Sequence, residues 1–164
     1  MYSNTVMWRE LIHRGGEAFQ QEQYLLAKER FQQALNLAEV ALNKAQTIPA
    51  FVEQLTEQPV EPPAEQVVQQ FLIACCNLAD THNMMGDSEV ADYYYQCAWQ
   101  SLQSLISATN IAPCLRQQAI IQLEKAAKEF TELAEYPVNS IMDAPWHHAN
   151  EQHYGQSKIT PIYH

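Results

Sequence analysis

The sequence predicts an all-α protein in which two antiparallel helical hairpins stack, followed by a capping helix and an extended tail. Three observations predict this fold class. Apolar residues recur at helical spacing, the pattern repeats after 64 residues, and prolines and capping residues fall where helices should begin or end. No stretch of useful length alternates between apolar and polar residues as a strand does.

The internal repeat lies in two pairs of predicted helices. In the second helix of each pair, the apolar stripe has members that are four, three, four and three residues apart. The matched positions are Ala27 with Ala91, Phe31 with Tyr95, Ala34 with Ala98, Ala38 with Leu102, and Ala41 with Leu105. In the first helices they are Met7 with Phe71, Trp8 with Leu72, Leu11 with Cys75, Ile12 with Cys76, and Gly15 with Ala79. Two copies of one hairpin are therefore expected.

Prolines and capping residues place the boundaries. We expect one domain over residues 1–136 and an extended tail over 137–164. Ser3 or Asn4 caps the first helix, Pro63 is the first helical position of the third, and Asp87 or Ser88 caps the fourth. The domain divides into hairpin one (4–46, with a turn near 21–23), a linker (47–62), hairpin two (63–108) and a capping helix (112–136).

Composition and charge narrow the function classes. The chain has 164 residues, 47% of them hydrophobic and 17% charged, which is typical of one globular domain. The formal net charge is −10, and no lysine or arginine lies between Lys44 and Arg116. We therefore expect no nucleic-acid partner and no membrane partner, whereas a basic protein partner and a purely solubilising role both remain open. Without a signal-peptide pattern or a spanning apolar run, a cytoplasmic protein is expected.

Motifs for catalysis are missing. The sequence contains no phosphate-binding glycine loop, no G-x-S-x-G and no H-E-x-x-H, so we expect no enzymatic activity and no cofactor. Cys75, Cys76, Cys97 and Cys114 stand in apolar helical contexts without C-x-x-C spacing. Buried thiols are the expectation, with a zinc site or a disulfide as the alternative.

Each hairpin contains a short motif of small and aromatic residues. The first comprises Gly15, Tyr24 and Ala27-x3-Phe31, and the second comprises Leu78-Ala79, the Gly86-Asp87 turn and Ala91-x3-Tyr95. With these motifs, the hairpins resemble the tetratricopeptide-repeat (TPR) superfamily over about residues 8–41 and 72–105. Small residues at these positions allow close helix approach. The chain departs from the family in its longer second helices, in the roughly 30 residues between the repeats, and in lacking the final proline of the motif.

The resemblance implies a peptide-binding groove along the first helix of each hairpin. When the groove positions of the family are transferred by helical phase, they fall on Arg9, Ile12, Gly16, Phe19 and Gln20 in the first hairpin. In the second hairpin they fall on Ile73, Cys76, Asp80, Asn83 and Met84. We select Arg9, Ile12, Phe19, Gln20, Ile73, Asp80, Asn83 and Met84 as the candidate site, although with two hairpins some of these side chains can belong to the core. The family's Lys and Asn clamp for a peptide carboxylate is absent. The predicted function is a protein-interaction module: an adaptor, scaffold or assembly factor.

Two features outside the repeat suggest alternatives. The tail carries His147, His148, His153 and His164, so a metal-binding protein or a metal-dependent helical enzyme is the alternative function. Apolar residues of the same tail also suggest that it could occupy the groove as a built-in ligand. Tyr93 points away from the buried stripe, toward the capping helix or toward a second subunit in a homodimer.

Overall fold

The computed structural model describes residues 3–47 and 63–134, with the side chains at 64–65 and 127–134 excepted. These residues form helices α1 (Asn4–Gln20), α2 (Tyr24–Thr47), α4 (Ala64–Met84), α5 (Ser88–Ser107) and α6 (Pro113–Ala134). The described part of the chain contains no strand, which confirms the all-α prediction. The tail over 137–164 and all of the predicted linker except Thr47 lie outside the described residues.

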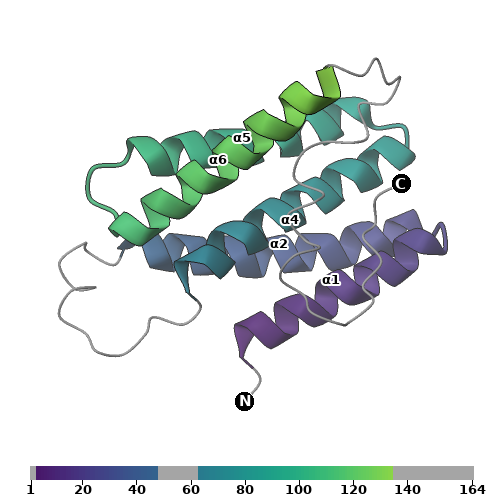
Figure 1. Cartoon of the computed structure of the whole chain (residues 1–164). Helices are drawn as coiled ribbons and strands as arrows, with labels where there is room; N and C mark the ends of the chain where they lie inside the picture. Colours follow the sequence, from purple (N-terminus) through teal and green to yellow (C-terminus); the bar gives the residue numbers. More distant parts are fainter. Residues whose placement is uncertain (1–2, 48–62, 135–164) are drawn as a thin grey trace.

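The helices pack in chain order, with α4 at the centre (Figure 1). Helix α1 packs against α2, α2 against α4, α4 against α5, and α6 against both α5 and α4. Contact between α1 and α4 is slight. The arrangement is consistent with a helical stack in which α1 is the edge helix and α4 has neighbours on several sides.

The turns of the two hairpins have the same backbone hydrogen bonds. The residues that form these bonds are again 64 positions apart. At the end of α1, the N–H groups of Glu22 and Gln23 donate to the carbonyls of Phe19 and Ala18, both at 2.9 Å. At the end of α4, Gly86 and Asp87 donate to Asn83 (3.0 Å) and His82 (2.9 Å). Both are Schellman motifs, which need a left-handed residue at the first non-helical position. Glu22 (φ 59°) and Gly86 (φ 85°) supply it.

Helix starts agree with the sequence analysis except at one proline. Ser3 is the first N-cap, and its hydroxyl accepts from the N–H of Thr5 (3.3 Å). Pro63 was expected inside the third helix but has an extended ψ of 148° and precedes α4 as its cap. Asp87 occupies the N-cap of α5 without a side-chain capping bond. Its carboxylate instead lies 3.4 Å from Nδ1 of His82.

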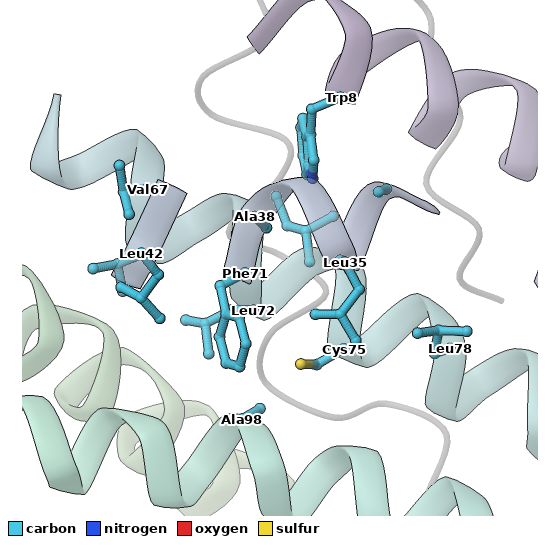
Figure 2. Close-up of a cluster of buried hydrophobic side chains, with 14 of the residues drawn as sticks. Trp8, Leu35, Ala38, Leu42, Val67, Phe71, Leu72, Cys75, Leu78 and Ala98 are labelled. Atoms are coloured by element: carbon cyan, nitrogen blue, oxygen red, sulfur yellow. The ribbon is translucent and has the colours of Figure 1, made fainter. Parts of the chain in front are cut away.

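The core runs through the stack and contains buried side chains from all of the described helices, and Figure 2 shows its part between α1 and α5. Figure 2 shows Trp8 of α1 over Leu35 and Ala38 of α2, with Phe71 and Cys75 of α4 beyond them. The small residues of the duplicated stripe are fully buried in both hairpins, namely Ala27, Ala34, Ala91 and Ala98. The repeat seen in the sequence is therefore a repeat of buried helix contacts.

Helices α1 and α4 are the first helices of their hairpins, but they have different neighbours. Some of their matched positions therefore differ in exposure. Ala74, Leu78 and Thr81 of α4 are buried, whereas their counterparts Glu10, Arg14 and Glu17 on α1 are exposed. On α1, Arg14 Nε lies 2.7 Å from Glu10 Oε1, and His13 Nδ1 lies 3.6 Å from Glu17 Oε2. The polar side of α1 is thus a solvated face, as expected for the edge of a stack.

Gly15 sets the distance between α1 and α2. A Cβ atom built at Gly15 would lie 2.7 Å from Cδ1 and 2.9 Å from Cζ of Phe31, far inside van der Waals contact. The Phe31 ring is fully buried and has no solvent-facing space into which to move. The first hairpin therefore depends on a glycine at this position.

Gly15→Ala is expected to destabilise the fold by about 1–3 kcal/mol, because overpacking outweighs the gain in helix propensity. Urea unfolding followed by circular dichroism measures the free energy of unfolding. Combining Gly15→Ala with Phe31→Leu should restore part of the loss relative to the sum of the single changes. Strict additivity of the two changes would contradict direct contact between these positions.

The left-handed turn residues provide a matched pair of substitutions. Glu22→Gly should stabilise the protein by about 0.5–1 kcal/mol, because a side chain is unfavourable at this φ. Gly86→Ala should lower stability by about 1 kcal/mol for the same reason, since a Cβ there meets nothing within 4 Å. The same urea assay tests both, and equal signs for the two changes would contradict the explanation.

Candidate functional site

The predicted site residues divide between core and surface. Ile12 and Ile73 belong to the buried hydrophobic core, as do Gly16 and Cys76 among the other groove positions. Arg9, Gln20 and Met84 are exposed, and Phe19, Asp80 and Asn83 are half-buried. The surface available along the predicted groove is therefore smaller than the helical phase alone suggested.

In the first hairpin, the candidates do not form one cluster. The Phe19 ring meets the Tyr24 ring edge-on, with 5.4 Å between centroids and an interplanar angle of 73°. Phe19 also packs against the core, so its contacts fasten the turn between α1 and α2. Gln20 is the last residue of α1, and Arg9 stands near its other end.

In the second hairpin, all the candidates except the buried Ile73 lie near one carboxyl group. Asp80 Oδ1 accepts a hydrogen bond from the Tyr95 hydroxyl at 2.5 Å, which joins α4 to α5. Asn83 lies one helical turn after Asp80, and its side chain lowers the pKa of the Tyr95 hydroxyl. Met84 follows on the same face of α4 and is 44% exposed. We call Asp80, Asn83, Met84 and Tyr95 the Asp80 cluster.

The electrostatics of the Asp80 cluster follow from its burial. Removal from water raises the pKa of Asp80 to about 7, although the hydrogen bond from Tyr95 opposes the rise. Burial also raises the pKa of the Tyr95 hydroxyl, and the adjacent Asp80 carboxylate raises it further. Asp80 is thus a hydrogen-bonded carboxyl that changes its protonation state near neutral pH.

Sequence reasoning assigned Tyr95 to the core and missed its bond to Asp80. A signal was nevertheless present in the repeat. Tyr95 matches Phe31 and Asp80 matches Gly16, so the second hairpin gains a hydroxyl and a carboxyl at paired positions. The two hairpins also differ at the preceding matched position, where the first has Gly15 and the second has Ala79. Two polar groups gained together inside one repeat indicate a contact between them.

The described cysteines are free thiols rather than a disulfide. Cys75 and Cys76 are buried, as expected, and burial raises the pKa of each thiol well above its usual range. Cys97 and Cys114 are half-buried. High pKa values make Cys75 and Cys76 poor nucleophiles and poor metal ligands at neutral pH.

Metal ligation was considered chiefly for the tail histidines, which lie outside the described residues. Within residues 3–47 and 63–134, no group of three or more His, Cys, Asp or Glu side chains is placed to hold a metal ion. In the same residues, no helix combines the length and the apolar character that are needed to cross a membrane.

Comparison with known proteins yields one family. The family model described as "Protein of unknown function (DUF2753)" matches residues 6–151, which include every described helix but the first residues of α1. No curated protein and no solved structure matches the chain.

The raised pKa of Asp80 predicts a pH-dependent stability. Because the folded value of about 7 exceeds the ordinary 3.8, the folded state binds more protons than the unfolded state between these pH values. The contribution of Asp80 to stability is therefore full below about pH 4 and is lost as the pH rises through 7.

Asp80→Asn should remove this loss of stability at rising pH, while it retains an oxygen acceptor for the Tyr95 hydroxyl. The free energy of unfolding of the variant should decline less from pH 4 to pH 7 than that of the wild type, by on the order of 3 kcal/mol. Urea titrations at several pH values measure this difference. Asp92→Asn, which alters an exposed aspartate on α5, is the control and should keep the wild-type slope. Identical slopes for Asp80→Asn and wild type would contradict the burial of this charge.

Proposed function

We propose that this chain, which belongs to the DUF2753 family, is a protein-interaction module that binds a peptide or protein partner at the Asp80 cluster. The observation that carries this proposal is the Tyr95–Asp80 hydrogen bond at 2.5 Å, which fixes a polar anchor beside the exposed Met84. A fixed polar group next to an accessible apolar side chain offers a partner both specificity and apolar contact.

The anchor is preorganised. Asp80, Asn83 and Met84 stand on one helix, and the Schellman turn after Met84 fixes the end of that helix. Tyr95 holds the carboxyl from the neighbouring helix. Groups that are already ordered lose little conformational freedom on binding, so more of the contact energy remains for affinity.

The chemistry of the cluster defines what it would recognise. The Asn83 amide can pair with N–H and carbonyl groups of a partner, while the Asp80 carboxyl, whose Oδ2 is buried, holds the Tyr95 hydroxyl in place beside it. Met84 is unbranched and flexible, so it adapts to differently shaped apolar side chains. A short peptide segment with one apolar residue beside hydrogen-bond donors fits these properties.

The TPR-like assignment and the cellular location belong to the same proposal. Two hairpins with identical Schellman turns and the close approach of Gly15 to Phe31 support a TPR-like stack. Four free thiols support a reducing compartment, and we propose the cytoplasm. An adaptor, scaffold or assembly factor is the role that accords with a binding platform of this kind.

Substitution of Met84 tests the proposal, and Met7 provides a matched control. The two methionines are 44% and 48% exposed, on α4 and α1 respectively, so both should tolerate arginine without unfolding. We expect Met84→Arg to lower recovery of a specific partner in affinity purification by about ten-fold or more, as for loss of an interface anchor. Met7→Arg should bind as the wild type does.

Circular dichroism and thermal unfolding verify that both variants are folded, and calorimetry with the purified partner then measures affinity. Equal binding by Met84→Arg and wild type would remove the Asp80 cluster as the binding site. Equal loss in both variants would attribute the effect to added charge.

A further inference from the structure

The end of helix α6 lies level with the Asp80 cluster. Helices α4, α5 and α6 follow one another with short connections, so each runs antiparallel to the one before, and α6 runs parallel to α4 (Figure 1). Helix α6 packs against both α4 and α5. Because α5 has 20 residues and α6 has 22, α6 returns along α5 to the level of the turn between α4 and α5. The chain therefore leaves α6 at the end of the stack where α4 carries Asn83 and Met84.

The family match continues past this helix. It covers residues 6–151, so residues 135–151 belong to the matched unit although they follow the last described helix, and residues 152–164 do not. We call residues 137–151 the Trp146 segment. A role that joins this segment to the helical domain of the same chain accords with a family match that spans both.

The sequence of the Trp146 segment has the chemistry that the Asp80 cluster would recognise. Trp146 combines a large apolar ring with an indole N–H donor, and His147 and Asn150 supply further donors. Met84 is a flexible apolar contact for an aromatic ring, and the Asn83 amide offers a carbonyl acceptor. Pro145 fixes its own φ, which reduces the conformational freedom that the segment loses on docking.

The connection between α6 and Trp146 has a suitable length. It comprises residues 135–145, and a flexible chain of this length has a root-mean-square span of about 20 Å. Packed helices are separated by about 8–10 Å, so the step from the end of α6 to the end of α4 lies within this span. A tethered ligand of matching span has an effective concentration in the millimolar range. The segment therefore has an advantage over a second copy or a free partner at lower concentration.

We propose that the Trp146 segment docks on the Asp80 cluster of its own chain, with Trp146 against Met84 and a donor of the segment on the Asn83 carbonyl. This inference rests on the function proposed for the cluster and adds its regulation, because a partner then gains the site by displacing the segment. A site that is about nine-tenths occupied in this way has an apparent affinity for its partner that is about ten-fold lower.

Photo-crosslinking in the full chain tests the location. Trp146→p-benzoylphenylalanine keeps an aromatic group in the segment, and benzophenones react preferentially with methionine side chains. We expect at least about five-fold more cross-linking to Met84 than to Met7, because the two are 44% and 48% exposed and differ in their distance from the docked segment. Mass spectrometry of a mixture of 15N-labelled and unlabelled chains shows whether the cross-link lies within one chain.

A labelled synthetic peptide of residues 137–151 measures the occupancy of the site. Fluorescence anisotropy should show about ten-fold tighter binding of this peptide to the Trp146→Ala chain than to the wild type, because the variant no longer fills its own site. Tyr154→Ala, which changes an aromatic residue outside the segment, should behave as the wild type. Adding Met84→Arg to Trp146→Ala should abolish peptide binding, whereas adding Met7→Arg should not.

Three results would overturn the proposal. Equal cross-linking to Met84 and Met7 would contradict the location, and cross-links between labelled and unlabelled chains would assign the site to the segment of a second copy. Equal peptide binding by the wild type and by Trp146→Ala would show that the segment leaves the cluster open. If Met84→Arg still lowers recovery of a partner in any of these cases, the function proposed for the cluster stands and its regulation by the segment fails.

Discussion

The burial of α4 is the constraint on which the rest of the structure depends. Nearly every residue from Val67 to His82 is buried, because α2, α5 and α6 all pack against this helix. A helix that is apolar on all sides can exist in water only inside other helices. Its polar residues must find partners there, and the Thr81 hydroxyl does so by donating to the Asn77 carbonyl at 2.6 Å.

Much of the fold could be predicted from the sequence because the physical signals are local. Apolar spacing predicted the helices, and Ser3 and Asp87 marked where two of them begin. Pro63 was assigned one position too far into its helix, because its fixed φ suits both a cap and a first helical residue. The identical Schellman turns were not foreseen, since Glu22 carries no glycine signal for a left-handed φ.

The candidate site could be predicted only in part. Helical phase selected Asp80, Asn83 and Met84, which are half-buried or exposed, but it also selected Ile12 and Ile73, which the structure buries. Helical phase gives the direction of each side chain around the axis of its own helix. It does not give the distance at which neighbouring helices pack. Contacts across helices, such as Tyr95 with Asp80 or Tyr94 with Gln32, depend on that approach. The two hairpins therefore share a backbone plan, and their distinctive surface chemistry lies where their side chains diverge.

The position of α1 at the edge of the stack has a consequence for local unfolding. Helix α1 is held mainly by α2, and the turn between them contains a glutamate at φ 59° where the other turn has glycine. Regions with few neighbours and an unfavourable backbone open at lower free energy than the whole fold. Detachment of α1 would uncover the fully buried Ala27 and Phe31 while leaving α4 enclosed by its other helices. The stack thus has a weak end and a strong centre, and the Asp80 cluster lies on helices of the centre.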